Sequence, residues 1–418
     1  MVYFYINYNM PFDIKSIFSK NFINLSLNQG VNIIATLIYT PILFQILGEE
    51  NFGLIQLAFS VVIILSIFVS YGYNLNGPIK IVQSQEAKKE NLIISEILNL
   101  RLTLSVLIFF ISIPFLYIHS NIIYQKILIF SYIILLAEAL NPLFYLQGIN
   151  KILPQSILNF FSKSLYVFLI ILFISDAEDA YLANFFYGIS ISFLFLIFWM
   201  KLFLSSSTFN YSFSLKKIII NLKENLHLFL SSTSTHFTVN GALIILSFFV
   251  SNQELGRFSL AYKVAFILRM IPVFFIQSIL QYATKIKDRS KDEFHKFLSN
   301  YFKFGLLTTL IIAIITCLFS DFIIEIFADE KIDYSSKILS LLSFIPFLAM
   351  LNFKNVVYIL VNDLKSKLNR ATFYTLLFML FSSLILSNLY GGYGLACSLL
   401  LTEIFSFFIH YFLINKKW

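Results

Sequence analysis

Apolar segments of about twenty residues recur along the whole chain, and a helix of that length spans the hydrocarbon core of a bilayer. The stretch 225–285 shows the pattern most clearly, because two such segments are separated only by the short polar turn 251–256. Membrane-spanning β-strands would instead alternate apolar and polar residues over about ten positions. The chain is therefore predicted to be an all-α integral membrane protein.

Composition supports this class and argues against several others. Of the 418 residues, 58% are hydrophobic and 12% are charged, about half the charged fraction of soluble domains. The net charge of +8 reflects loops that face the cytoplasm, so no nucleic-acid partner is expected. Cys317 and Cys397 both lie in apolar runs, which predicts neither a disulfide framework nor a metal site. The N-terminus has no signal-peptide pattern, and no phosphate-binding loop for ATP is present.

The apolar segments predict about twelve spans, and the basic residues orient them. With the N-terminus inside, 22 Lys and Arg residues fall on the cytoplasmic side, 4 fall outside and 4 remain in spans. This bias places both termini in the cytoplasm. The predicted spans are 22–47, 52–79, 92–118, 122–147, 152–175, 180–204, 225–250, 256–282, 300–327, 335–361, 371–389 and 393–414.

An internal repeat predicts two lobes. The segment FGLIQLAF at 52–59 aligns without gaps with LGRFSLAY at 255–262, which places Gly53 on Gly256. The first and seventh spans start from the same side, so the two six-helix lobes are parallel repeats around a central cavity. The predicted division is a cytoplasmic segment 1–21, an N-terminal lobe 22–204, an inter-lobe linker 205–224, a C-terminal lobe 225–414 and a cytoplasmic tail 415–418.

Five cations fall within or near the ends of spans, where an unpaired charge is costly and is by default a functional candidate. They are Arg269, Lys263, Lys163, Lys354 and Arg101. Arg269 is the leading candidate for binding phosphate, because guanidinium matches phosphate oxygens in a bidentate way. Lys263 lies about 120° around the same helix, so the two cannot both point straight into one cavity. The structural alternatives are an ion pair of Arg269 with Glu403 or Glu138, and snorkelling of Lys354 and Arg101 to a membrane surface.

Other polar residues in the spans are candidates for coupling and for sugar contact. Glu138, Glu403 and His236 could change protonation during transport, or could serve only in ion pairs and hydrogen bonds between helices. Asn24, Asn28 and Asn32 recur every four residues on one helix face, where amides suit sugar hydroxyls or join helices. Pro142 and Pro272 predict kinks, and Gly391 to Gly394 predict a turn between two spans.

Several segments together resemble one known family. They are LGEENFGLIQLAF, SYGYNLNGPIKIV, NPLFYLQGINKILPQSILNFFSKSLYVFLIILFI, LKENLHLFLSSTSTHFT, LGRFSLAYKVAFILRMIPVFFIQSIL and YGGYGLACSLLLTEIFSFFIHYF. In order and spacing they resemble the polysaccharide (O-antigen repeat unit) flippases of the multidrug/oligosaccharidyl-lipid/polysaccharide exporter superfamily. Gln45 departs from the family, which often has Arg there. The family often has a Lys where this chain has Lys163.

The resemblance implies a function and its setting. It implies that an oligosaccharide on a polyprenyl pyrophosphate moves from the cytoplasmic to the outer leaflet by alternating access, without ATP, in the bacterial cytoplasmic membrane. No cofactor is expected, and H⁺ or Na⁺ coupling is a candidate. The expected partners are this substrate, membrane lipids, and polysaccharide polymerase and chain-length proteins. Two alternatives remain: export of a drug or of a cell-wall lipid precursor, and a membrane glycosyltransferase or polymerase, although the predicted outside loops are short for such an enzyme.

Overall fold

The structure is a computed structural model that describes residues 12–84, 87–116, 121–205 and 214–414, although not the side chains of 12–28, 87–88, 115–116, 205, 215–216, 231, 232, 235, 239, 281, 288 and 365. These residues form helices and no strand, which confirms the all-α class. The helices are α1 Phe12–Ser70, α2 Tyr73–Val82, α3 Ala87–Leu116, α4 Ile122–Ser131, α5 Ile133–Ala139, α6 Leu143–Gly148, α7 Leu153–Phe173, η1 Ala177–Asp179, α8 Ala180–Ser205, α9 Leu215–Leu246, α10 Asn252–Arg289, α11 Lys291–Leu318, α12 Ser320–Ala328, α13 Asp333–Leu342, α14 Ile345–Leu351, α15 Phe353–Val361 and α16 Lys365–Ile414.

Within the described ranges, nine helical segments are long and apolar enough to cross a membrane. Two of them, Gln29–Val82 and Ser366–Ile414, are about twice the length that one crossing requires. Each contains a kink at a glycine with positive φ, 73° at Gly48 and 56° at Gly391, a conformation that costs glycine little. These kinks turn the chain back where the sequence predicted turns. The predicted number of twelve spans stays a prediction, since α9 is not among the nine.

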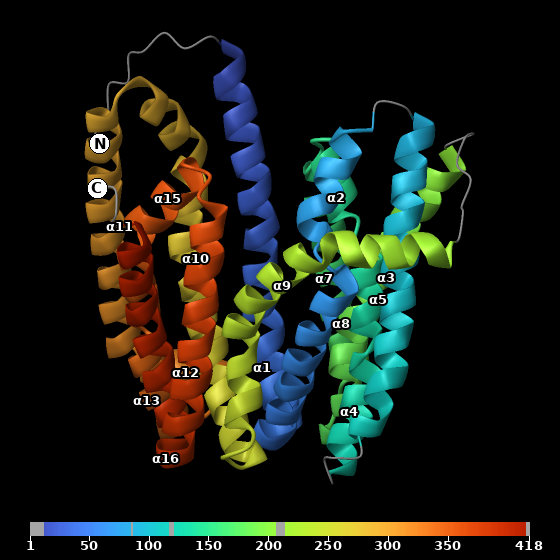
Figure 1. Cartoon of the computed structure of the whole chain (residues 1–418). Helices are drawn as coiled ribbons and strands as arrows, with labels where there is room; N and C mark the ends of the chain where they lie inside the picture. The colour runs from blue at the N-terminus through green and yellow to red at the C-terminus, as the bar shows by residue number, and fades with distance from the viewer. Residues whose placement is uncertain (1–11, 85–86, 117–120, 206–213, 415–418) are drawn as a thin grey trace.

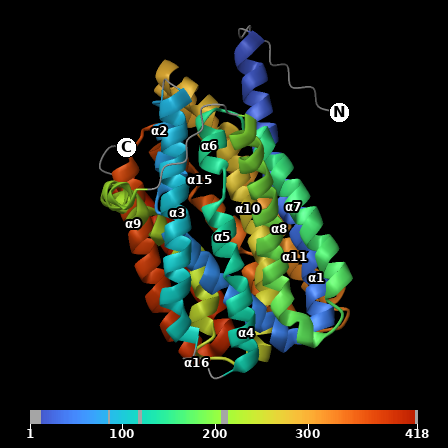
Figure 2. The same ribbon diagram turned by 90° about the vertical axis from the view of Figure 1, so that its right-hand side faces the viewer.

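The helices form two groups that converge at one end (Figure 1). Helices α2–α8 lie on the right of the view and α10–α16 on the left, with α1 between them; Figure 2 shows α3, α5, α7 and α8 along the outer side of the first group. At the lower end one apolar core joins both groups and includes Phe52 of α1 and Leu260 of α10. At the upper end the cores are separate.

The two separate cores show that the lobes part toward the end where α1 begins. One core contains Tyr73, Phe144 and Trp199, all from the first lobe. The other contains Ile279 and Phe353 from the second lobe. The shared core holds the lobes together at the lower end of Figure 1, while no apolar core of the described residues joins them at the upper end.

Each lobe contains one helix that is interrupted twice. In the first lobe it is α4, α5 and α6, and in the second it is α13, α14 and α15. The matching pieces have ten residues in α4 and α13 and seven in α5 and α14, which supports the repeat. The predicted kink at Pro142 is confirmed as a break between α5 and α6. Pro272, in contrast, lies inside the continuous helix α10.

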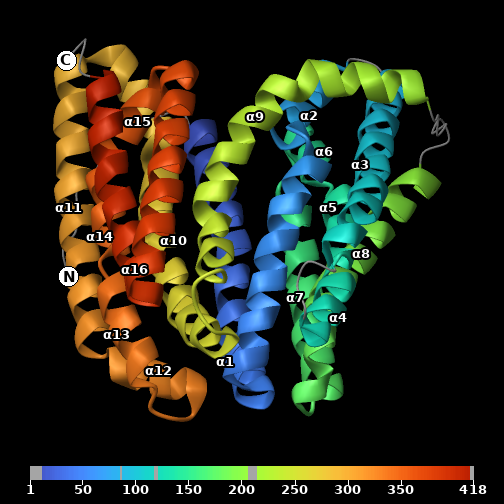
Figure 3. The same cartoon turned by 60° about the horizontal axis from the view of Figure 1, so that its bottom comes forward.

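Helix α9 connects the lobes a second time. Its first half runs across the first lobe before the helix turns along the second (Figures 1 and 3). Asn225 of α9 accepts a hydrogen bond from Asn76 of α2 at 2.7 Å, and Phe229 stacks on Tyr71 with ring centroids 4.6 Å apart. The hydroxyls of Thr233 and Thr238 bond carbonyls one turn earlier, a pattern that favours helix bending. The helix begins at Leu215, inside the predicted linker.

Candidate functional site

The two repeat segments found in the sequence lie against each other at the convergent end. A Cβ added to Gly53 would come within 2.7 Å of the backbone nitrogen of Gly256 and would collide with the carbonyl of Asn252. A Cβ on Gly256 would collide with the carbonyl of Glu49. Only glycine permits this approach. The sequence match therefore marks the point where the lobes are in closest contact.

Polar contacts also join the two lobes at this end, and we call the contact of Glu49 with Arg257 the seal. Nε of Arg257 in α10 lies 2.8 Å from both carboxylate oxygens of Glu49 in α1. Gln253 donates to Glu49 at 2.7 Å, and Gln45 donates to the carbonyl of Phe327 at 3.3 Å. Glu49 thus forms an ion pair between the lobes, which sequence reasoning missed.

An aromatic cluster lies in the first lobe, on the side that faces Lys263 of the second lobe. Tyr39 packs edge-on against Tyr166, with centroids 5.0 Å apart, and Tyr166 against Tyr187 at 5.3 Å. Phe59 also packs edge-on against Tyr187 at 5.3 Å. Four rings from α1, α7 and α8 therefore form one continuous surface in the first lobe, which we call the aromatic cluster.

Lysines from both lobes lie over this cluster. Nζ of Lys163 in α7 is 3.7 Å from the centroid of Tyr187, and Nζ of Lys263 in α10 is 5.1 Å from that of Phe59 and 5.8 Å from that of Tyr39. Ring faces attract cations, but more weakly than a carboxylate does. In the described part of the chain neither lysine has a salt bridge, and the two ammonium groups repel each other. Lys163 is only 7% exposed. The site therefore favours an anion between the lobes.

Arg269 points elsewhere. Its Nε donates to Oε1 of Glu403 in α16 at 2.7 Å, so of the two carboxylates suggested by the sequence its partner is Glu403. The predicted divergence of Lys263 and Arg269 around α10 is observed, since Lys263 faces the first lobe and Arg269 the second. The pair lines a small cavity with Thr238, Tyr262 and Thr402.

Arg101 lies in the interior of the first lobe. It is fully buried, so snorkelling to the membrane surface is the wrong explanation for this residue. Its guanidinium donates to Oδ1 of Asn74 at 2.9 Å and to the carbonyl of Asn141 at 3.2 Å. The side-chain amides of Asn74 and Asn141 donate in turn to the two oxygens of Glu138, at 3.2 and 3.3 Å. These four residues close a hydrogen-bonded ring around the break at Pro142, which we call the Arg101 ring.

The remaining candidates make no hydrogen bond to these groups among the described residues. Lys354 lies 4.7 Å over the ring of Phe302 and 3.4 Å from the hydroxyl of Ser299. His236 is exposed and interacts electrostatically with Glu138 across the lobes. Asn32 is half-buried, and its carbonyl accepts from Thr36 at 2.8 Å. The side chains of Asn24 and Asn28 lie outside the described part of the structure.

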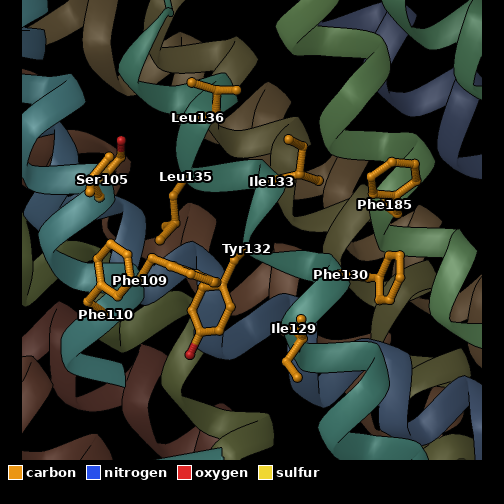
Figure 4. A pocket seen from close by; sticks show the side chains of 11 residues that line it. Ser105, Phe109, Phe110, Ile129, Phe130, Tyr132, Ile133, Leu135, Leu136 and Phe185 are labelled. Carbon is orange, nitrogen blue, oxygen red and sulfur yellow. The ribbon is translucent and has the colours of Figure 1, made fainter. Parts of the chain in front are cut away.

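A larger groove of about 440 Å³ lies elsewhere on the first lobe, between α3, the break from α4 to α5, and α8 (Figure 4). Its lining is mainly apolar and aromatic, with Phe109 packed edge-on against Tyr132 at 5.4 Å. None of its lining residues is charged. The groove therefore does not suit an anionic group, and the lysines at the lobe interface are the better site.

Sequence reasoning found the cations but missed the groups that surround them. The four rings of the aromatic cluster carry no pattern that separates them from the other tyrosines and phenylalanines of the chain. Asn74 lies in the family segment SYGYNLNGPIKIV, which is the one available signal for the Arg101 ring.

Comparison with known proteins identifies the family and the fold. The model for the family described as "Polysaccharide biosynthesis protein" matches residues 18–281. Two proteins named "Putative O-antigen transporter" are similar over 250 residues, or 58% of this chain. The one from Shigella dysenteriae is 28% identical, and the one from Escherichia coli (strain K12) is 25% identical. The matched part covers 62% and 59% of those relatives, about three fifths of their length.

Several solved structures share this fold. An inward-facing multidrug resistance MATE transporter of the MOP superfamily aligns with a TM-score of 0.70 at 15% identity, covering 93% of this chain and 96% of that one. The lipid II flippase MurJ, in an inward closed conformation, aligns with a TM-score of 0.70 at 16% identity, covering 94% and 86%. The chain belongs to the polysaccharide biosynthesis protein family and has the fold of MATE transporters and MurJ.

Proposed function

We propose that the protein flips polyprenyl-pyrophosphate-linked oligosaccharides from the cytoplasmic to the outer leaflet of the bacterial cytoplasmic membrane by alternating access, without ATP. One observation carries the proposal. Lys163 and Lys263 come from opposite lobes and share one aromatic cluster, without a salt bridge in the described part of the chain. A pyrophosphate between them would supply the missing negative charge and would contact both lobes at once.

The arrangement of the lobes supports the same mechanism. The chain is more similar to an inward-facing MATE transporter, with a TM-score of 0.70, than to an outward-facing one, with 0.59. The seal of Glu49 and Arg257 would then be the outer gate, and both termini would be cytoplasmic, as the basic residues predict. Substrate would enter from the end where the two cores are separate.

The names of the relatives favour this substrate class over a drug. Both curated relatives are named for O-antigen, whereas the structural neighbours include multidrug transporters as well as a lipid II flippase and do not separate the two substrates. An exporter of cationic drugs should carry acidic rather than basic groups at the lobe interface. Polysaccharide polymerase and chain-length proteins are the partners that would use the flipped product.

The experiment is the double substitution Lys163→Ala with Lys263→Ala. We expect each single variant to reduce flipping and the double variant to abolish it at normal membrane abundance, because the anion loses both countercharges. Surface polysaccharide in a transporter-deficient strain measures the effect, together with flipping in proteoliposomes.

Lys126→Ala is the matched control. Nζ of Lys126 also lies over a tyrosine ring, that of Tyr181 at 3.5 Å, but between α4 and α8, away from the lobe interface. Its loss should leave flipping unchanged. Full flipping by the double lysine variant would refute the proposed site.

Coupling is a separate part of the proposal. A substrate with about two negative charges leaving a negative-inside cell gains about 2.3 kcal/mol per charge at 100 mV. We therefore expect flipping in proteoliposomes to slow when the potential is collapsed with a potassium ionophore. Undiminished flipping with a pH gradient alone would favour H⁺ coupling through Glu138, Glu403 or His236, and dependence on sodium would favour Na⁺.

A further inference from the structure

The bond between Arg269 and Glu403 uses only one of the hydrogen-bond donors of the arginine. A guanidinium group has five N–H donors. Within the described residues, only Nε of Arg269 has a hydrogen-bond partner, Oε1 of Glu403 at 2.7 Å. The Arg269 side chain is 33% exposed, in contrast to the fully buried Arg101. Arg269 therefore has free donors and access to a ligand while it neutralises Glu403.

Glu403 depends on Arg269 alone. The neighbouring hydroxyls of Thr238 and Thr402 donate to carbonyls of their own helices, at Ser234 and Ser398. Among the described residues, Glu403 accepts no hydrogen bond other than the one from Arg269. The other titratable groups that interact with Glu403 are Tyr262 in α10 and His410 in α16. The carboxylate thus has one charged partner, and that partner faces the cavity.

The position of Arg269 on α10 separates it from the anion site. Arg269 is six residues beyond Lys263, about 9 Å along the helix and about 120° around it. Lys263 points toward α1, whereas Arg269 points toward α16. The guanidinium group of Arg269 could contact an anion held by Lys163 and Lys263 only if its side chain turned away from Glu403.

We infer that Glu403 is an internal counter-anion that occupies Arg269 in the empty transporter and is displaced from it by the substrate's pyrophosphate. The inference rests on the proposed function and adds a role for one carboxylate. When the transporter is empty, Glu403 neutralises Arg269 while the lobes change conformation. When the transporter is loaded, the pyrophosphate neutralises Arg269 instead.

The arrangement explains how an anion-binding transporter can return empty. A cation without a partner is costly to enclose in a low-dielectric interior. The pair with Glu403 removes that cost during the return step, at the expense of competing with substrate in the binding step. Glu403 therefore sets the balance between affinity and turnover.

The experiment uses the full-length protein in nanodiscs and geranylgeranyl pyrophosphate as the probe. Glu403→Gln removes the competing charge at nearly constant shape, so we expect the probe to bind about tenfold to a hundredfold more tightly, the range of a charged hydrogen bond. In proteoliposomes the first turnover should be preserved and steady-state flipping should fall several-fold. Glu96→Gln is the matched control, because it breaks the pair of Glu96 with Lys217 at 2.6 Å, away from the cavity, and should not alter affinity.

The outcomes separate this inference from the proposed function. If Glu403→Gln weakens binding or leaves it unchanged, Glu403 only orients Arg269 and the inference is wrong. If Arg269→Ala with Glu403→Gln flips normally, Arg269 takes no part and the inference is also wrong. If the wild type does not bind the probe, the proposed function itself fails. Should Glu403→Gln not fold, Glu403→Asp keeps the charge on a shorter side chain and should still raise affinity, and an unchanged or lower affinity would refute the inference.

Discussion

Two arginines in apolar surroundings, each associated with a glutamate, lie in opposite environments. Arg101 has no exposed surface, and two asparagines connect it to Glu138 within one lobe. Arg269 is one-third exposed and has one direct bond, to Glu403, beside a small cavity. A cation that is fully buried inside one lobe can hold that lobe together but cannot receive a ligand. A cation with free donors at a cavity can. Access and number of partners, rather than charge, separate the two roles.

The largest effect is expected from Arg101→Ala. The substitution removes a fully buried side chain and leaves Oδ1 of Asn74 and the carbonyl of Asn141 without their donor, a loss of about 3–5 kcal/mol in the free energy of unfolding. Folded protein in the membrane should fall sharply, as measured by fluorescence-detected gel filtration. Arg269→Ala should retain most of its folded protein because the Arg269 side chain is one-third exposed and makes a single hydrogen bond. Equal losses from the two substitutions would remove the distinction between the arginines.

Substitutions of the two glutamates test the same comparison, with smaller expected effects on stability. Glu138→Gln should lower the free energy of unfolding by about 1.5–3 kcal/mol, because the Arg101 ring loses a charged acceptor. Glu403→Gln should leave thermal stability nearly unchanged and act on affinity and turnover. Thermal denaturation of the purified variants measures the first effect and probe binding the second. If only Glu403→Gln lowered the thermal stability, Glu403 would be the structural carboxylate and Glu138 would not.

The two broken helices provide a repeat-matched pair of asparagines. Asn141 and Asn352 both lie at the second break of their helices. Asn141 donates to a carboxylate, whereas Asn352 donates to neutral Ser406 and contacts His410 at 3.1 Å. We expect Asn141→Ala to cost about 1.5–3 kcal/mol and Asn352→Ala about 0.5–1.5 kcal/mol. Thermal melts of both variants test the order, and a reversed order would contradict it.

The smallest effect is expected from Lys354→Ala. This lysine lies over Phe302 and near Ser299, within the second lobe and away from the aromatic cluster. Its partly exposed cation–π contact is worth about 0.5–1 kcal/mol. Flipping should match the wild type within a factor of two. A complete loss of flipping would place Lys354 in the substrate path and extend the site beyond the two interface lysines.

The sequence by itself determined the fold class, the repeat and the charged residues inside spans. Apolar runs of spanning length leave few alternatives, because an unsatisfied backbone in lipid is too costly for anything but helices and closed barrels. The repeat could be recognised from the match between Gly53 and Gly256, because close backbone contact at these positions requires glycine in both copies. The kink at Pro142 followed from the missing N–H of proline.

Only the tertiary structure decided what those charged residues do. Arg101 and Arg269 are both arginines in apolar surroundings, and no local pattern shows that one meets Asn74 and the other Glu403, 134 positions away. The tyrosines under Lys163 and Lys263 come from three helices, so the sequence did not show that they form one cluster. Periodicity is a property of one helix, whereas burial, countercharge and access depend on how several helices pack, and these decide whether a cation supports the fold or faces a ligand.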